Sequence, residues 1–286
     1  MSVDVGLYYI NLKHRTDRRT FMEAQFERLG LTVERIEAVT PADLTEAQIR
    51  DNCLPYRRLG RAPAEVACSL SHIEAWRRFA ASGREVCVIL EDDALLSSQM
   101  PALLDELANG LTGGVIKLDA MDHPLRLAEA HRSLGQHFAV RRLYTCTSRA
   151  TAYALDRPTA EEMLVRYEFL HIPVDLVVFN PYGPLKGRIQ VNQLTPAIAV
   201  CLELAGRPQV GVDPSLLSNW TRGSVAASNL EQDLVAREKS LLKNLRFADR
   251  VLMLRSALAE EFISGPSKFM QDYFWGVKKH TVRFVP

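Results

Sequence analysis

The 286-residue sequence has few of the features that assign a protein quickly to a class. It contains only five cysteines, an odd number, and no C-x-x-C pair. This pattern argues against a disulfide framework and a zinc site, and it predicts a reducing compartment. The formal net charge is only +1. A chain so nearly neutral has no general attraction for nucleic acid, so we expect no nucleic-acid partner.

Long apolar runs and glycine-rich phosphate motifs are also missing. No stretch is long enough to span a bilayer, and the N-terminal Met-Ser-Val-Asp-Val lacks the pattern of a signal peptide. We therefore expect a cytoplasmic protein, at most peripheral to the cytoplasmic face of a membrane. Neither G-x-G-x-x-G nor the P-loop pattern occurs, which removes the two commonest nucleotide-binding signatures.

Strand and helix patterns alternate over the first two hundred residues. A strand at 5–10, an amphipathic helix at 18–29 ended by Gly30, and a strand at 33–39 predict a β-α-β opening and a parallel sheet. The same reasoning predicts further strands at 86–90, 114–118, 150–155, 188–191 and 197–202, and helices at 43–51, 63–81, 100–111 and 157–167. These alternations predict an α/β fold.

The pattern changes after about residue 205. We expect an α/β domain over 1–205, a loop over 206–228 and a helical extension over 229–286 that packs on the first domain. Residues 269–284 mix aromatic and basic side chains, which predicts either contact with an anionic membrane surface or packing across the domain. The polar stretch 122–140, with three histidines, is interpreted as surface.

Three adjacent carboxylates, Glu91, Asp92 and Asp93, follow the apolar strand at 86–90. They repel one another and lose hydration when buried, so at a sheet edge they need a compensating cation. Oxygen ligands suit Mg²⁺ or Mn²⁺, which would stabilise a departing diphosphate. Glu91 and Asp93 project to the same side of extended backbone and would share one ion. The alternative is a solvated acidic turn or helix start.

A second polar group lies on the predicted helix at 63–81. Glu65, Cys68, His72 and Trp76 fall on one stripe of this helix, and Ser71 flanks it. The carboxylate and the imidazole would bind a ribose or phosphate, or position a catalytic group. The alternative is a structural Glu–His hydrogen bond inside the core.

Two further sites are predicted from single segments. Asn11-Leu-Lys-His-Arg15-Thr-Asp-Arg18 follows the first strand, at the sheet edge where open α/β sheets bind ligands. Arg15 and Arg18 would add charge or stack on a base, and the alternative is a solvated loop. Asp175 lies among proline and apolar residues, and is interpreted as a partly buried general base or as a helix N-cap.

The order and spacing of these motifs closely resemble glycosyltransferase family 25. The motifs are Y-I-N-L-K-H-R-T-D-R at 9–18, E-V-A-C-S-L-S-H at 65–72 followed by Trp76, and I-L-E-D-D at 89–93, with later blocks at 151–155, 173–175 and 193–196. The family contains lipopolysaccharide and lipooligosaccharide biosynthesis enzymes and the collagen galactosyltransferases of animals. The resemblance covers residues 5 to 200, and departs from the family at Ala67, where glycine is usual.

The resemblance implies a GT-A fold, Rossmann-like, with a mostly parallel central sheet flanked by helices and an acidic metal motif. It also implies a UDP-sugar donor, usually UDP-galactose, and inversion at the anomeric carbon. By matching position, the nucleotide would lie near Asn11 and Arg15, the donor side would be lined by Glu65, Ser71 and His72, and the metal and ribose–diphosphate would be held by Glu91, Asp92 and Asp93. Asp175 is the expected base, with Asp119 second.

The sequence therefore predicts a metal-dependent, inverting transfer of a hexose to a hydroxyl of a glycan acceptor. The expected hexose is galactose, and the expected acceptor is lipopolysaccharide or lipooligosaccharide. Two alternatives stay open. A metal-dependent nucleotidyltransferase would use the same groups but release pyrophosphate, and a non-catalytic, glycan-binding pseudoenzyme would keep only the fold.

Overall fold

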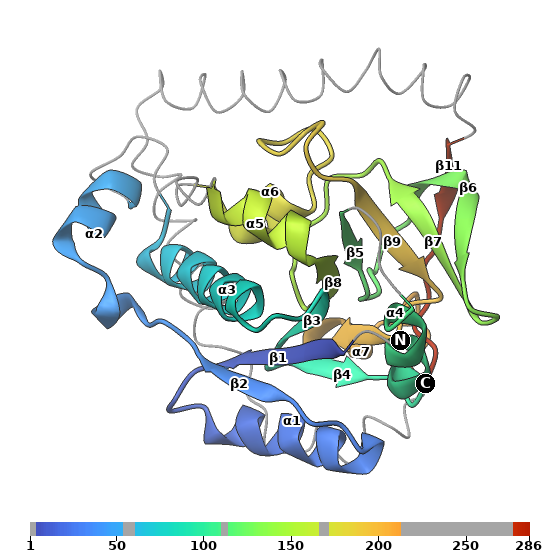
Figure 1. Cartoon of the computed structure of the whole chain (residues 1–286), viewed down its shortest axis with the longest axis horizontal. Coiled ribbons are helices and arrows are strands. Elements are labelled where there is room, and N and C mark those ends of the chain that lie inside the picture. The colour runs from blue at the N-terminus through green and yellow to red at the C-terminus, as the bar shows by residue number, and fades with distance from the viewer. Residues whose placement is uncertain (1–3, 54–60, 110–113, 166–171, 213–276) are drawn as a thin grey trace. The chain divides into compact units, whose positions relative to one another are not determined.

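A nine-stranded sheet forms the centre of the protein in the computed structural model (Figure 1), which describes residues 4–53, 61–109, 114–165, 172–212 and 277–286. The strand order is β11-β6-β7-β9-β5-β8-β3-β1-β2, and β10 and β4 form a separate pair. The strands are β1 (Val5–Asn11), β2 (Glu34–Glu37), β3 (Val86–Glu91), β4 (Ala94–Leu96), β5 (Val115–Lys117), β6 (Leu125–Leu134), β7 (Phe138–Leu143), β8 (Ala152–Asp156), β9 (Val191–Thr195), β10 (Ala199–Cys201) and β11 (Val277–His280).

Most of the central strands run in one direction. β1 pairs in parallel with β2 and β3, and β5 pairs in parallel with β9. β8 is antiparallel to both β3 and β5, so β3 and β5 on either side of it point the same way. Five of the six strands from β2 to β9 therefore share a direction, and their carboxyl ends lie at one edge of the sheet.

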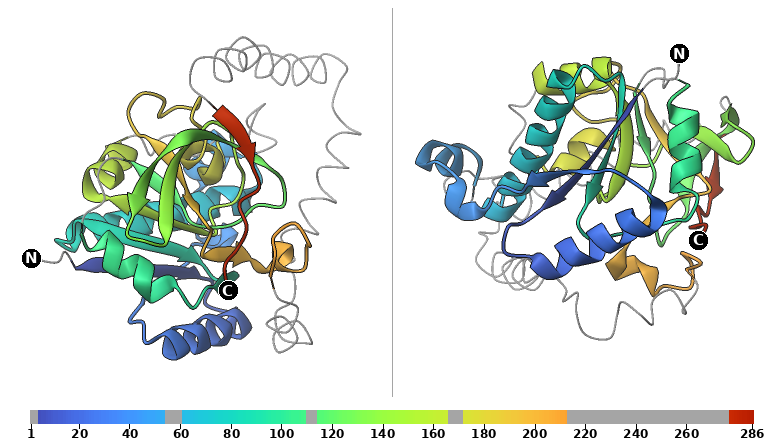
Figure 2. Two further views of the ribbon diagram at one scale, coloured as in Figure 1. Left: turned by 90° about the vertical axis from the view of Figure 1, so that its right-hand side faces the viewer. Right: turned by 60° about the horizontal axis from the view of Figure 1, so that its bottom comes forward.

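Helices cover both faces of the sheet (Figures 1 and 2). The helices are α1 (Thr16–Leu29), the 3₁₀ turn η1 (Pro41–Asp43), α2 (Glu46–Asn52), α3 (Pro63–Ala81), α4 (Met100–Leu107), α5 (Arg157–Val165), α6 (Val174–Val178) and α7 (Leu202–Ala205). On one face, Phe26 of α1 packs edge-on against Tyr9 of β1, with ring centroids 5.1 Å apart. On the other, Trp76 of α3 donates its indole N–H to the Tyr153 hydroxyl of β8 at 2.9 Å.

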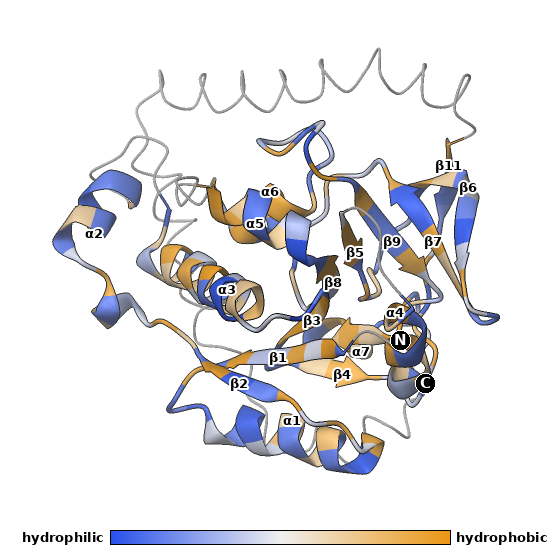
Figure 3. Cartoon of the chain, in the orientation of Figure 1, coloured by the Kyte–Doolittle hydropathy of each residue, from blue (hydrophilic) through white to orange (hydrophobic). Residues whose placement is uncertain are grey.

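Local sequence explains where the two long helices begin and end. Pro63 occupies the first turn of α3, where a missing backbone N–H costs nothing. Gly30 ends α1 in the left-handed region at φ 66°, and its N–H reaches the carbonyls of Phe26 and Glu27. Figure 3 shows hydrophobic residues gathered in β3 and β4, whereas β6 is largely hydrophilic. Between helices on both faces, β3 is buried over Val86–Leu90, as its unbroken apolar sequence predicts.

Some expectations about secondary structure are wrong. The strand expected at 188–191 is β9 at Val191–Thr195, which begins where the expected strand ends. The three histidines of the polar stretch 122–140 are exposed, as expected, but this stretch also holds most of the hairpin β6–β7, for which no strands were predicted. Its outer position in the sheet leaves His131, Arg132 and Ser133 exposed in succession, so the polar residues hide the strand pattern. Residues 277–280, expected within a helical extension, form strand β11 beside β6. This segment gains the backbone hydrogen bonds of a sheet edge, which outweigh local helix preference.

The described residues confirm the predicted fold class, an α/β sheet with helices on both faces in the GT-A manner. The chain divides into two compact units, one of residues 1–225 with 279–286 and one of residues 226–278. The predicted loop and helical extension lie mostly outside the described residues and stay predictions there. Val282 and Phe284 are buried, so residues 279–286 pack within the first unit, to which they belong. No described helix is long and apolar enough to cross a membrane.

Candidate active site

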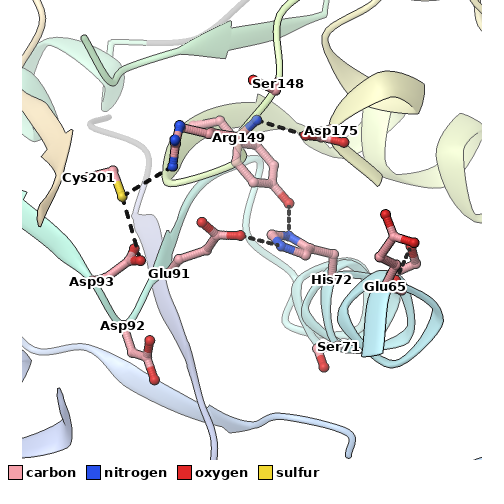
Figure 4. Close-up of polar contacts among 12 residues, drawn as sticks. Glu65, Ser71, His72, Glu91, Asp92, Asp93, Ser148, Arg149, Asp175 and Cys201 are labelled. Atoms are coloured by element: carbon pink, nitrogen blue, oxygen red, sulfur yellow. Dashed lines mark hydrogen bonds and ion pairs between the residues drawn. The ribbon is translucent and has the colours of Figure 1, made fainter. Parts of the chain in front are cut away.

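The candidate site lies where β1, β3 and β5 end. Their last residues are Asn11, Glu91 and Lys117, and the shared strand direction brings these ends to one edge of the sheet. Ligands of open α/β sheets bind at such an edge. Figure 4 shows the carboxylates that follow β3 together with His72 from α3 and with Arg149, Asp175 and Cys201 from later segments.

Asp92 is fixed by two residues of the first motif. One carboxylate oxygen accepts the Asn11 side-chain N–H at 2.8 Å, and the other accepts Arg18 at 2.6 Å. Arg18 also lies 3.5 Å from Asp93, and Arg35 donates to the Asn11 side chain at 3.1 Å. The structure thus joins three predicted site residues into one charge-compensated group, and Asp92 points away from its two neighbours (Figure 4).

Glu91 and Asp93 face the same space (Figure 4). One oxygen of Asp93 lies near the Cys201 sulfur at 3.6 Å, and its other oxygen is buried with no hydrogen-bond partner among the described residues. Burial and the neighbouring Glu91 charge raise the pKa of Asp93 to about 7, although Arg18 opposes the shift. The charge of Asp93 is therefore only partly compensated by the residues around it.

This pair fits a hard divalent cation. Two carboxylates supply the oxygen ligands that Mg²⁺ and Mn²⁺ prefer, and the orphaned Asp93 oxygen would gain a partner. Bound metal would also remove the repulsion that raises the Asp93 pKa. The geometry is compatible with the predicted metal role of both residues, and that role stays a prediction.

His72 connects the core to Glu91. Its Nδ1 lies 2.9 Å from the Tyr153 hydroxyl, and its Nε2 lies 3.4 Å from a Glu91 oxygen. Because that hydroxyl already accepts the Trp76 N–H, all groups are satisfied when Tyr153 donates to Nδ1 and the Nε2 proton faces Glu91. Burial alone would raise the pKa of Glu91, but the His72 hydrogen bond and the charges of Lys117 and Arg18 hold it below its ordinary value.

Cys68 adds a third polar atom beside these two residues. A metal-ligating atom of Cys68, of His72 and of Glu91 all lie within 4.8 Å of one another. Sequence analysis placed Cys68 and His72 on one stripe but did not include Glu91 with them. Burial raises the pKa of the Cys68 thiol well above its usual value, so the sulfur is protonated near neutral pH. A sulfur ligand suits softer metals, whereas the carboxylate pair Glu91 and Asp93 suits Mg²⁺ or Mn²⁺.

A sealed ion pair stands at the end of β5. Lys117 Nζ lies 3.0 Å from Asp119 Oδ1, and both side chains are 0% exposed. The same ammonium group lies 4.5 Å from the centre of the Phe179 ring. Burial raises the pKa of Asp119 to about 6, while Lys117 acts in the opposite direction. Asp119 is one of the predicted site residues, whereas its partner Lys117 is not.

Asp175 contacts a residue that sequence analysis missed. One oxygen of the half-buried Asp175 accepts the Arg149 backbone N–H at 2.8 Å, and the other accepts the Leu176 N–H at 2.8 Å. The Arg149 side chain lies 2.6 Å from Glu203 and 3.7 Å from the Cys201 sulfur. Long-range contacts define this arrangement. The sequence gives one hint of this arrangement: Lys117 lies inside an apolar strand, and Asp119 follows it two residues later.

Three predicted donor-side residues lie apart from the carboxylate cluster. Glu65 accepts the Ala62 backbone N–H at 2.9 Å at the start of α3. Ser71 projects from another side of α3 than His72 (Figure 4) and accepts the Val39 N–H at 2.9 Å. Arg15 pairs with Asp17 at 2.7 Å. Each has a local structural contact, and their donor-binding roles stay predictions.

Comparison with known proteins places the chain in a family. Residues 5–178 match the model of glycosyltransferase family 25, described as LPS biosynthesis protein. The chain is 34% identical over 95 residues to a "Glycosyltransferase 25 family member" of Anopheles gambiae, covering 30% of this chain and 16% of that protein. It is 29% identical over 127 residues to "Procollagen galactosyltransferase 1-B" of Xenopus laevis, covering 42% of this chain and 20% of that protein.

One solved structure, a "mannose-1-phosphate geranyltransferase" from Thermus thermophilus, aligns with 68% of this chain and 74% of its own. Its sequence identity is 15% and its TM-score 0.35. The family match covers more than half of the chain and places it among the glycosyltransferase families. The chain belongs to glycosyltransferase family 25, which confirms the predicted family.

Proposed function

We propose that the chain is a metal-dependent, inverting glycosyltransferase. It would transfer a hexose, galactose from UDP-galactose, to a hydroxyl group of a glycan acceptor such as lipopolysaccharide or lipooligosaccharide. Family membership and the named procollagen galactosyltransferases among its relatives support this reaction class. The observation that carries the proposal is the pair Glu91 and Asp93 at the end of β3. Burial and the neighbouring Glu91 charge raise the pKa of Asp93 to about 7, and one Asp93 oxygen is buried without a hydrogen-bond partner among the described residues.

The donor would bind against the residues that follow β1 and β3. Glu91 and Asp93 would hold Mn²⁺ or Mg²⁺, which supplies positive charge for the diphosphate leaving group. Asn11 and Arg18 fix Asp92, and this group would face the nucleotide part of the donor. His72 keeps the Glu91 carboxylate oriented through its long Nε2 contact.

Asp175 is the proposed base. It would take the proton from the acceptor hydroxyl as that oxygen attacks the anomeric carbon, on the side opposite the diphosphate. Each of its oxygens accepts one backbone N–H and keeps a second lone pair for a proton. Asp119 is the second candidate, since burial brings its pKa to about 6, but its side chain is sealed beside Lys117.

The metal assignment is tested by Asp93→Ala at saturating Mn²⁺. We expect kcat/KM to fall by about a hundredfold or more, because loss of a ligand removes several kcal/mol of charge stabilisation. Glu162→Ala is the matched control. Glu162 pairs with Arg188 and lies beside Gly114, just ahead of β5 rather than at its carboxyl end. Full transfer by the Asp93 variant would overturn the assignment.

The reaction class is tested by its products. A panel of UDP-, GDP- and CMP-sugars with Mn²⁺ should give a nucleoside diphosphate from one donor, and no pyrophosphate. Release of pyrophosphate would instead identify a nucleotidyltransferase. Failure to bind any of these donors or UDP by calorimetry would support the non-catalytic alternative.

The base is tested by Asp175→Asn. The amide oxygen can still accept the Arg149 N–H, while the amide NH2 replaces the oxygen that accepts the Leu176 N–H, so one local hydrogen bond is lost together with the proton acceptor. We expect kcat to fall by about 10²–10⁴-fold. A fall of less than about tenfold would exclude Asp175 as the base, and Asp119→Asn would then be the next variant to assay.

A further inference from the structure

Arg149 has a backbone conformation that L-residues rarely adopt. Its φ is 71°, and it is the one non-glycine residue with positive φ among those the structure describes. Glycine would adopt this conformation without strain. The presence of arginine therefore indicates that its side chain has a role that offsets the backbone strain. Strained residues of this kind concentrate where a side chain must be held ready for a ligand.

Buried charged groups hold this conformation. The Arg149 N–H donates to Asp175 at 2.8 Å, and its carbonyl accepts from Lys117 Nζ at 2.6 Å. Lys117 Nζ also lies 3.4 Å from the Ser148 carbonyl and 3.0 Å from Asp119. A lysine and an aspartate from separate segments therefore fix both sides of one residue. Their contacts overdetermine the backbone, as a strained residue requires.

The Arg149 side chain points toward the carboxylate pair (Figure 4). Its guanidinium lies 3.7 Å from the Cys201 sulfur, which in turn lies 3.6 Å from Asp93. The ion pair with Glu203 is partly open, with side-chain exposures of 28% and 35%. Partly exposed pairs contribute little, so this guanidinium can exchange its carboxylate partner for another anion.

Two other cations that the structure describes beside the carboxylates are already committed. Arg18 is 13% exposed and pairs with Asp92 and Asp93. Lys117 is fully buried beside Asp119. A diphosphate bound at Glu91 and Asp93 through a cation keeps negative charge on its remaining oxygens. Of the three cations, Arg149 has the most exposed side chain, and its planar fork matches two phosphate oxygens.

We propose that Arg149 exchanges Glu203 for the diphosphate of the nucleoside-diphosphate donor. Lys117 and Asp175 are then positioning residues that hold Arg149 in its strained conformation. The inference rests on the proposed function, because it requires a diphosphate at the carboxylate pair. It adds a substrate-binding residue and explains why a buried lysine stands at the end of β5.

Arg149→Gly is the test variant, because glycine keeps the backbone conformation and removes only the side chain. Calorimetry with UDP and Mn²⁺ should show about 10- to 100-fold weaker binding than wild type, the loss expected for a charged hydrogen-bonding pair. UMP, which lacks the second phosphate, should lose less. The melting temperature should not fall, since the strain is relieved. Arg149→Lys should bind UDP with intermediate affinity.

Two controls separate the guanidinium from general effects. Arg188→Gly removes another partly exposed arginine that pairs with a glutamate, and should leave UDP affinity unchanged. Glu203→Gln removes the present partner of Arg149, and should leave UDP affinity unchanged or raise it. Loss of affinity in Glu203→Gln as large as in Arg149→Gly would contradict the exchange of partners.

Asp175 variants separate positioning from proton transfer. Asp175→Asn still accepts the Arg149 N–H and should bind UDP as wild type does, whereas Asp175→Ala should bind UDP several-fold more weakly. Equal UDP affinity in wild type and Arg149→Gly would overturn this inference while leaving the proposed function intact. If wild type binds neither UDP nor GDP with Mn²⁺ and forms no nucleoside diphosphate, the proposed function itself fails.

Discussion

The ends of β3 and β5 both carry charged residues, but they differ in the balance of positive and negative charge and in exposure to solvent. At the end of β3, one cation, Arg18, lies 2.6 Å from Asp92 and 3.5 Å from Asp93, and the Glu91 and Asp93 side chains are 28% and 19% exposed, so three carboxylates share one arginine. At the end of β5, Lys117 and Asp119 lie 3.0 Å apart with opposite charges and fully buried side chains, although neither Asp119 oxygen makes a well-aligned hydrogen bond among the described residues. The partly exposed carboxylates at the end of β3 can bind an external cation, whereas the fully buried ion pair at the end of β5 has a structural role.

Lys117→Met should have the largest effect on stability. It leaves the Asp119 charge buried without its partner and removes the donor to two carbonyls. We expect the free energy of unfolding to fall by about 3–5 kcal/mol, measured by urea denaturation. Adding Mn²⁺ should not restore it, because the lost charge lies at the β5 end.

Two further variants sharpen that result. Lys117→Met combined with Asp119→Leu should recover much of the loss, since an apolar pair replaces the ion pair. Arg18→Met should cost less than Lys117→Met because Asp92 keeps its hydrogen bond from Asn11 and Asp93 is partly open to water, and Mn²⁺ should partly compensate it. If Mn²⁺ rescued Lys117→Met but not Arg18→Met, the comparison of the two strand ends would be wrong.

Tyr153→Phe should have a smaller effect that reaches Glu91. Removing the hydroxyl leaves the Trp76 N–H and the His72 Nδ1 without a partner in the core. We expect a loss of about 1–3 kcal/mol in unfolding free energy. Because His72 then loses its fixed orientation, Mn²⁺ affinity should also fall, whereas Phe179→Leu, at the other side of the Tyr153 ring, should lower stability without changing Mn²⁺ affinity. Unchanged Mn²⁺ affinity in Tyr153→Phe would separate His72 from the metal pair.

The same contrast explains what the sequence could predict. Helix α3 has the bounds expected from it, 63–81, because proline, an apolar stripe and a following glycine all agree. The acidic cluster was readable because three carboxylates end an unbroken apolar strand. Strand β4 was missed because it follows those carboxylates directly and is only three residues long.

The rest of the site depends on contacts between distant segments. Arg149 is ordinary in sequence, and only its φ and its contacts with Lys117 and Asp175 distinguish it. The alternative prediction of a Glu65–His72 hydrogen bond is wrong. Glu65 accepts a backbone N–H at the start of its own helix, whereas His72 contacts Glu91 on strand β3. Helical spacing predicts a shared face, but the partner across the core is set by packing.

The pH dependence of Mn²⁺ binding gives the smallest expected effect. The fold raises the pKa of Asp93 from 3.8 to about 7. Between these two pH values, and without metal, Asp93 is protonated in the native state but ionised in the unfolded chain. Stability from this group is therefore greatest at low pH and is lost as pH rises through about 7. Mn²⁺ competes with that proton, so its affinity changes in the opposite direction.

Calorimetry should show Mn²⁺ binding about tenfold more tightly at pH 8 than at pH 6, because about a tenth of Asp93 is ionised at the lower pH and about nine-tenths at the higher. Asp93→Asn should bind weakly at both pH values and lose the dependence. Asp119→Asn should keep it, although burial raises the pKa of Asp119 to about 6, because that carboxylate is balanced by Lys117 rather than by metal. If Asp119→Asn abolished the dependence and Asp93→Asn did not, the cation would belong at β5 and the two strand ends would exchange roles.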